Sequence, residues 1–290
     1  NSHGQDQAIH RAVLLQDEWQ LAQDWSLTLG SRLDQHEAFG WEHSPRAYLM
    51  YQFNPDWQMR IGAGRGYKAP SLKQLSASYN SIGGGGRFTI YGNPDLQPET
   101  NTTYEWGVEY QQDAFTFGTT LFENQLNDLI HTRCTANCGQ RGREQRTYEN
   151  IDQARIRGLE LEMNWAFHSD WQWHGNYTYL DAKNRTGKHR LSDRSRHLLN
   201  NTLQWQLTEQ LNNQLRHEYI GSQLTGSLDQ QYELPSYHLL HWDMNYQLSK
   251  NTSVQAGISN LSNKRLSNSN EQFDYTEPGR SYHLSIQVGF

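Results

Sequence analysis

The chain has 290 residues and a formal net charge of −6, and apolar side chains make up 35% of it, which is low for a globular core. Yet it contains 10 Trp and 16 Tyr. No run approaches the ~20 apolar residues of a membrane-spanning helix, and the mild acidity argues against nucleic acid as a partner. A polar but aromatic composition fits a transmembrane β-barrel, whose strands face lipid on one side and water on the other.

The elements that the sequence predicts are strands with alternating apolar and polar residues. In the last of them, Tyr282, Leu284, Ile286 and Val288 share one face. Several strands exceed the ~9–11 residues needed to cross a bilayer, whereas globular strands average ~5–6. The predicted strands span residues 9–22, 25–35, 45–53, 57–67, 102–112, 115–124, 147–168, 171–181, 195–208, 212–221, 235–249, 252–262 and 281–290.

The connections between these strands alternate between short turns and long loops, as in bacterial outer-membrane barrels with the short turns in the periplasm. The short turns are Gln23-Asp24, Asn54-Pro-Asp56, Asp113-Ala114, Ser169-Asp170, Glu209-Gln210 and Lys250-Asn251. An aromatic residue (Trp25, Trp57, Phe115 or Trp171) opens the strand after four of them. These rings predict an aromatic girdle at one membrane interface; the alternative is a set of hydrophobic anchors in a soluble sandwich.

The longest connection lies between the strands 57–67 and 102–112 and is rich in Gly, Pro, Ser and Asn. A connection that long in a β protein is usually functional. It carries two motifs, Gly66-Tyr-Lys-Ala-Pro-Ser-Leu72 and Gly92-Asn-Pro-Asp-Leu-Gln-Pro-Glu-Thr100. The motif positions singled out are Tyr67, Pro70, Gly92, Asn93, Pro94, Asp95, Leu96, Pro98 and Glu99.

These motifs, together with the strand Tyr104-Glu-Trp-Gly-Val-Glu-Tyr110, resemble the C-terminal barrel half of TonB-dependent outer-membrane receptors. The group nearest in character includes the ferric enterobactin and colicin I receptors. The resemblance continues through residues 148–162 and 260–265 to Phe290, which matches a C-terminal barrel signal. It implies an all-β, antiparallel transmembrane barrel in the outer membrane of a Gram-negative cell.

The same resemblance implies binding and import of a ferric siderophore, with no enzymatic activity and no resident cofactor. The partners that it implies are a siderophore of the catecholate type, the TonB energy-coupling complex, outer-membrane lipid and lipopolysaccharide, and bacteriocins or phage. Two kinds of rival remain. One is a haem or cobalamin receptor of the same architecture. The other is a protein of another class: a soluble β-sandwich binding module, or an outer-membrane phospholipase or protease.

Strand parity bears on domain organisation. Counting back from Phe290 through thirteen predicted strands places Asn1 on the long-loop side, but single-chain bacterial barrels normally have an even strand number. We therefore expect residues 1–290 to be the C-terminal portion of a larger even-stranded barrel. The plug domain, the first strands and the targeting segment would lie upstream.

Cys134 and Cys138 are the two cysteines and lie in one predicted loop, 125–146. In an exported protein such a pair predicts a disulfide at a loop tip, and unreduced protein would then have no free thiol. The competing interpretation is a metal site with His131 as a third ligand. It is weaker because structural zinc needs four ligands and a fourth is not nearby.

Cations and tyrosines gather in the long loops. Arginine offers paired donors to oxyanions and stacks on rings, so the set suits an anionic, aromatic ligand such as a ferric catecholate. The alternative is that these charges are simply solvated or contact lipopolysaccharide phosphates. The predicted ligand-binding residues are Lys68, Tyr79, Arg87, Tyr91, Arg133, Arg141 and Arg143.

Other polar groups have weaker interpretations. The Gly83–Gly86 run lacks the Lys-Ser/Thr ending of a phosphate loop and predicts a flexible loop tip. The 13 histidines are scattered, and most are interpreted as polar filler. Charged side chains expected to point inward either contact a plug or pair across strands; they include Glu105, Glu109, Glu160, Glu162, Arg155 and Arg157.

Overall fold

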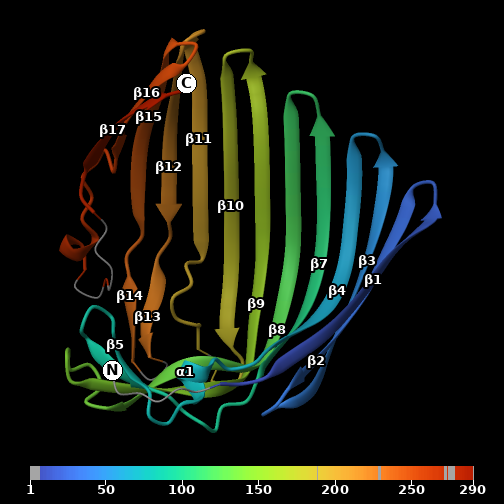
Figure 1. Cartoon of the computed structure of the whole chain (residues 1–290), viewed down its shortest axis with the longest axis vertical. Coiled ribbons are helices and arrows are strands. Elements are labelled where there is room, and N and C mark those ends of the chain that lie inside the picture. The colour runs from blue at the N-terminus through green and yellow to red at the C-terminus, as the bar shows by residue number, and fades with distance from the viewer. Residues whose placement is uncertain (1–6, 188, 228–229, 271–272, 274–277, 290) are drawn as a thin grey trace.

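A computed structural model describes residues 7–187, 189–227, 230–270, 273 and 278–289, without the side chains of Asp152 and Ser227. Its main element is a curved antiparallel sheet whose thirteen successive strands are neighbours in chain order (Figure 1). All thirteen predicted strands are present. They are β1 (His10–Ala22), β2 (Trp25–His36), β3 (Gly40–Asn54), β4 (Trp57–Lys68), β7 (Glu99–Gln112), β8 (Phe115–Ala136), β9 (Glu144–His168), β10 (Trp171–Asn184), β11 (His197–Thr208), β12 (Leu211–Ile220), β15 (Tyr237–Ser249), β16 (Thr252–Ser259) and β17 (Ser281–Val288).

The boundaries differ most where strands continue into predicted loops. β8 and β9 remain paired up to Ala136 and Gln145, so most of the predicted loop 125–146 is a two-stranded extension. Further short elements lie inside other predicted loops. They are α1 (Leu72–Leu75), β5 (Asn80–Gly83), β6 (Phe88–Tyr91), β13 (Gln223–Ser227), β14 (Gln230–Leu234) and the 3-10 helix η1 (Leu266–Asn268). Elements of three to five residues are too short to show a hydrophobic period.

The glycine run forms the turn between β5 and β6. Gly84, Gly85 and Gly86 have φ values of +57°, +62° and +93°, a left-handed region that glycine adopts without steric cost. The helices among the described residues are too short and too polar to span a bilayer. Phe290, proposed as a C-terminal barrel signal, lies outside the described residues.

The two ends of the sheet differ as the sequence predicts. Short turns join β1–β2, β3–β4, β7–β8, β9–β10, β11–β12 and β15–β16 at one end, and the long loops gather at the other (Figure 1). At the short-turn end Trp25 stacks on Tyr51 with ring centroids 4.3 Å apart, and Trp171 stacks on Trp205 at 5.7 Å. The aromatic girdle at this rim is therefore built from pairs of rings on neighbouring strands.

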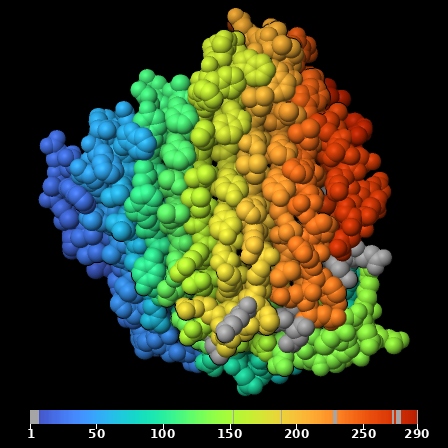
Figure 2. All heavy atoms as spheres, turned by 180° about the vertical axis from the view of Figure 1, so that it is seen from behind, coloured from blue at the N-terminus to red at the C-terminus, as the bar shows by residue number. Residues whose placement is uncertain are grey.

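The apolar faces point away from the hollow of the sheet. Strand register and alternation place Leu284 and Ile286 on the outer face, where they are 72% and 65% exposed. Seen from behind, the strands form a continuous wall (Figure 2). These side chains do not meet in a dry interior, so the soluble β-sandwich alternative is wrong.

One face assignment made from the sequence is wrong. Arg155 and Arg157 were expected to point inward with Glu160 and Glu162. β9 is paired without interruption from Gln153 to Trp165, so odd-numbered residues share the outer face of Leu159. The two arginines therefore point outward. The sign of their charge suggested an inward position, but the two-residue period of the strand decides it.

The sheet has two open edges among the described residues. β1 pairs with β2 alone and β17 with β16 alone, and every residue of both strands is exposed. The prediction that these strands are part of a larger even-stranded barrel stays a prediction.

The buried apolar clusters lie at the loop end. One forms where Leu191 of the β10–β11 loop packs on Leu129, Ile151 and Ala182. The second joins Leu234, Tyr237, Leu239, Leu266 and Phe273. The loops are thus packed against the sheet and against one another, and the loop end holds most of the dry core.

Candidate ligand-binding site at the loop end

The central segment, residues 69–98, joins β4 to β7 and begins with a capped turn. Pro70 is buried, and Ser71 and Gln74 form a reciprocal capping box that starts α1. The chain later returns past this turn at Gly92, where an added Cβ would lie 2.1 Å from the carbonyl oxygen of Ser76. Only glycine fits so close to a backbone oxygen.

The second sequence motif fastens the returning chain to β9. The Asn93 side chain accepts a hydrogen bond from the Asp95 N–H at 3.0 Å and donates to the Tyr148 carbonyl at 2.9 Å. Leu96 follows and is only 1% exposed. Pro94 and Asp95 are exposed, so the motif contains both buried anchors and an exposed turn.

The side-chain amide of Asn150 also connects the central segment to β8 and β9. The Asn150 side chain accepts from the Gln97 N–H at 2.8 Å and donates to the carbonyls of Gln97 and Asp128 at 2.9 and 2.6 Å. It therefore joins the central segment, β8 and β9 at one point.

Glu99 closes the attachment at the start of β7. Its carboxylate accepts from the Ile130 N–H at 2.7 Å and lies 2.6 Å from Lys68 Nζ. The side chain is nearly buried, and a buried charge is tolerated only when it is paired and hydrogen-bonded. Lys68, predicted to bind ligand, therefore has a structural partner.

The β5–β6 hairpin reaches the tip of the β8–β9 extension. β6 pairs in parallel with the start of β9, with Phe88 opposite Glu144. The Gly142 N–H donates to the Arg87 carbonyl at 2.7 Å. This contact brings Arg87 beside the turn that carries Arg141 and Arg143.

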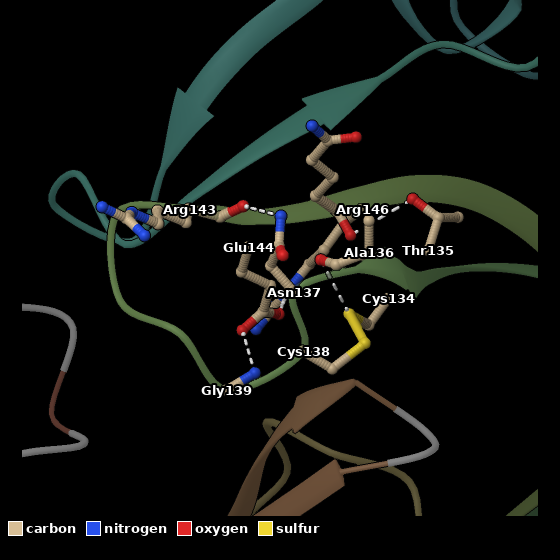
Figure 3. The surroundings of a disulfide bond; sticks show 10 residues. Cys134, Thr135, Ala136, Asn137, Cys138, Gly139, Arg143, Glu144 and Arg146 are labelled. Atoms are coloured by element: carbon tan, nitrogen blue, oxygen red, sulfur yellow. Dashed lines mark hydrogen bonds and ion pairs between the residues drawn. A yellow bond between two sulfur atoms is a disulfide. The ribbon is translucent and has the colours of Figure 1, made fainter.

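The disulfide at that tip is present, as predicted. Cys134 and Cys138 are bonded, and the turn that they enclose is held by hydrogen bonds from Gly139 N–H to Glu144 and from Asn137 to the Arg143 carbonyl (Figure 3). His131 Nδ1 lies 2.8 Å from a backbone carbonyl oxygen. Because both sulfurs are bonded to each other, the competing metal site is wrong.

The loops also contact one another across the loop end of the sheet, called the mouth. Arg87 donates to the Phe273 carbonyl at 3.4 Å, across 186 positions of sequence. An added Cβ at Gly139 would lie 2.7 Å from the Gln230 side chain, so the disulfide-linked tip touches β14. Figure 1 shows these segments lying across the open end of the sheet.

The predicted cations divide into two groups. Lys68 and Arg133 lie beside carboxylates, with Arg133 3.4 Å from Glu149. Arg141 and Arg143 are exposed, and their side chains make no ion pair or hydrogen bond with a described residue. Together with half-buried Arg87, these two residues are called the tip arginines.

The two predicted tyrosines lie at the other end of the hairpin. Tyr91 is 37% exposed and pairs with Asn80, and Tyr79 accepts the Gly92 N–H through its carbonyl at 3.1 Å. Beside them, burial and then the charge of nearby Tyr79 raise the pKa of Tyr148 above its usual value. The predicted tyrosines thus lie at the opposite end of the β5–β6 hairpin from Arg87, and Arg87 contacts the β8–β9 turn that carries Arg141 and Arg143.

Two further residues belong to this assembly: Arg146, which the sequence offers as one of the loop cations, and Tyr148, to which sequence reasoning gave no role. The Arg146 guanidinium lies 3.9 Å from the centre of the Phe88 ring and 2.5 Å from Glu144. Tyr148 supplies a carbonyl and a ring beside the central segment. Tyr148 opens the stretch 148–162 that carries the family resemblance, which was the available signal.

The chain matches a known family over most of its length. The model for "TonB dependent receptor-like, beta-barrel" covers residues 2–261. The chain therefore belongs to the TonB-dependent receptors and is part of an outer-membrane β-barrel. Its homologues are transport receptors, in line with a role that is not enzymatic.

Two relatives match almost the whole of this chain. The iron-regulated outer membrane virulence protein of Vibrio cholerae serotype O1 is 31% identical over 96% of this chain and 44% of its own length. The ferric enterobactin receptor PirA of Pseudomonas aeruginosa is 31% identical over 97% and 41%. The chain thus spans less than half the length of these relatives.

Solved structures agree on the fold. A mutant of the Pseudomonas aeruginosa ferric enterobactin receptor PfeA, in complex with enterobactin, has a TM-score of 0.78 and 28% identity, over 97% of this chain and 45% of its own. The siderophore receptor PirA of Acinetobacter baumannii gives 0.78 and 25%, over 97% and 46%. The copper transporter OprC, at 15% identity and 0.77, shares the fold alone.

Proposed function

We propose that this chain supplies the loop-bearing strands of a receptor that binds a ferric siderophore of the catecholate type and imports it. The observation that carries the proposal is the pair Arg141 and Arg143. They are exposed at the mouth without a carboxylate partner among the described residues, in a chain about 30% identical to ferric enterobactin receptors.

The chemistry of the tip suits such a ligand. A ferric tris-catecholate is anionic and presents flat aromatic rings. Guanidinium groups bind oxyanions through paired N–H donors and stack on rings. Tyr91 offers a partly exposed ring at the opposite end of the β5–β6 hairpin from Arg87. Lys68 and Arg133 contribute less, because carboxylates already offset their charges.

The open edges of the sheet support a larger assembly. Unpaired strand edges are not tolerated in hydrocarbon, and β1 and β17 each have one free edge among the described residues. We propose that further strands of the same receptor close the barrel, that a plug domain fills it, and that the TonB complex energises import.

Growth rescue tests the ligand. A receptor-deficient strain expressing the complete reading frame that encodes this chain is grown under iron limitation with a ferric tris-catecholate, a ferric hydroxamate, or haem as the iron source, and cobalamin uptake is measured separately. We expect rescue by the catecholate complex. Rescue by haem alone, or uptake of cobalamin alone, would replace the siderophore assignment with the corresponding rival.

A charge variant tests the site. In the double variant Arg141→Gln/Arg143→Gln we expect the Kd for the ferric catecholate to rise roughly tenfold or more, because charge-assisted hydrogen bonds are lost. Arg11→Gln is the matched control, an exposed arginine on β1, far from β9 in the sheet order. Equal Kd values for both variants would contradict the assignment of the tip.

A further inference from the structure

Glu144 is a buried carboxylate at the base of the turn that carries Arg141 and Arg143. Its side chain is 11% exposed, and a buried charge is tolerated only when it is paired and hydrogen-bonded. Both of its oxygens are used. One accepts the Gly139 N–H at 3.1 Å (Figure 3), and the other accepts from Arg146 Nε at 2.5 Å. The carboxylate therefore joins the disulfide-linked turn to the strand that follows it.

Arg146 continues this attachment to the β5–β6 hairpin. Its side chain is 15% exposed, and its guanidinium carbon lies 3.9 Å from the centre of the Phe88 ring. Phe88 is the first residue of β6 and is paired in parallel register with Glu144. A guanidinium between a carboxylate and a ring has its charge and its flat face occupied. Arg146 therefore serves the internal structure of the tip.

The hairpin that is attached in this way carries Arg87. Arg87 directly precedes Phe88, and its carbonyl accepts the Gly142 N–H at 2.7 Å. The spacing between Arg87 and the other two tip arginines therefore depends on how β6 is fastened to the start of β9. The side chains of Glu144 and Arg146 reinforce the backbone bond at this point.

A buried ion pair of this kind defines geometry more than it adds stability. The cost of desolvating both charges offsets much of their attraction. A carboxylate and a guanidinium nevertheless bind through directional hydrogen bonds, which fix their relative orientation. At this position the fixed orientation applies to the two segments that carry the tip arginines.

We propose that Glu144 is a positioning residue that sets the spacing of the tip arginines, and through them the affinity of the mouth for an anionic ligand. This inference rests on the proposed function, because it takes the tip arginines as the ligand contacts. Glu144 itself does not touch the ligand, since both of its oxygens are directed to Gly139 and Arg146.

The substitution Glu144→Gln separates this role from simple packing. Glutamine has nearly the same shape, but one of its two terminal atoms is an acceptor and the other is a donor. Both Glu144 oxygens face donors, so glutamine can keep the contact with Gly139 or with Arg146, but not both. Arg146→Lys is a second variant, which keeps the charge but loses the flat group over Phe88. Glu209→Gln is the matched control, an exposed glutamate in the short β11–β12 turn.

Binding is measured on the complete receptor as the Kd for a ferric tris-catecholate. We expect the Kd to rise roughly fivefold in Glu144→Gln and roughly twofold in Arg146→Lys, and to stay unchanged in Glu209→Gln. A positioning residue loses its effect once the residues it positions are removed. In the Arg141→Gln/Arg143→Gln background, Glu144→Gln should therefore raise the Kd by less than about twofold. An unchanged Kd in Glu144→Gln, or the full fivefold effect in that background, would overturn the proposal.

Hydrogen exchange without ligand distinguishes this inference from the proposed function. Amides of residues 137–143 should exchange roughly tenfold faster in Glu144→Gln, whereas those of residues 155–165 in β9 should not change. Unchanged exchange at 137–143 would mean that Glu144 does not hold the turn. A parent receptor that does not bind the ferric catecholate would overturn the proposed function, and faster exchange in Glu144→Gln would then still support the positioning role.

Discussion

The two ends of this sheet are held together in different ways. At the short-turn end the contacts are local, since turns join adjacent strands and rings pair across them, as Trp25 does with Tyr51. At the loop end the contacts are remote in sequence. Asn93 reaches Tyr148 across 55 positions and Arg87 reaches Phe273 across 186. The short-turn end repeats one kind of contact between neighbouring strands, whereas the loop end depends on a few individual residues.

A single substitution should therefore have a smaller effect at the short-turn end than at the loop end. A change at the short-turn end removes one of several similar ring pairs, while a change in the loop attachment removes a contact with no substitute. Each variant is made in the complete receptor, because the described strands leave two open sheet edges.

The largest effect is expected for Leu96→Ala. Leu96 is 1% exposed between the central segment and the sheet, and buried Leu→Ala changes cost about 2–5 kcal/mol. Hydrogen exchange of residues 69–98 should accelerate accordingly. Leu72→Ala is the control, because Leu72 is 37% exposed on α1. Protection that falls equally in both variants would show that the segment is not fastened at Leu96.

Gly92→Ala should act at the same attachment with a smaller effect. Its Cβ would meet the backbone oxygen of Ser76 at 2.1 Å, and overpacking of this kind costs about 1–3 kcal/mol. Limited proteolysis within residues 69–98 should become faster. Gly118→Ala provides the comparison, since nothing lies within 4 Å of an added Cβ there. Similar cleavage rates would contradict the close approach.

The sequence predicts the short-turn end well because its signals are local. Alternation located all thirteen strands of the main path, and an aromatic after each of four turns located the girdle. Both depend on residues a few positions apart. The inward assignment of Arg155 and Arg157 failed when charge was preferred to the strand period.

The loop end could be predicted only in part. The motif 92–100 was identified, but its residues were not known to contact Tyr148, Asn150 and Ile130 until the structure placed them. The disulfide was predictable because both cysteines lie in one short stretch. The parallel pairing of β6 with β9 was not, because short elements without a period leave no sequence signal.

At the short-turn end, a double-mutant cycle on Trp171 and Trp205 should give a modest coupling. The rings are stacked with a 14° interplanar angle, and such pairs contribute about 0.5–1.5 kcal/mol beyond burial. The measurement is the free energy of unfolding of Trp171→Ala, Trp205→Ala and the double variant. A second cycle on Trp171 and Trp25, which lie on distant strands, should be additive within about 0.5 kcal/mol. Coupling of equal size in both cycles would show that the girdle does not act through pairs.

The smallest effect concerns alkaline pH at the loop end. Burial raises the folded-state pKa of Tyr148, so the neutral phenol is favoured in the folded state. Its contribution to stability is complete below the ordinary tyrosine pKa of about 10 and is lost as pH rises through the raised value. Proteolysis of residues 69–98 should therefore accelerate above pH 10, whereas Tyr148→Phe, which cannot ionise, should lose part of that acceleration.

The short-turn girdle has Trp171 and Trp205, which carry no ionisable group, so their coupling should be the same at pH 8 and pH 11. A pH dependence at the girdle equal to that of the loop attachment would mean that the whole barrel loosens, and the distinction between the two ends would be lost.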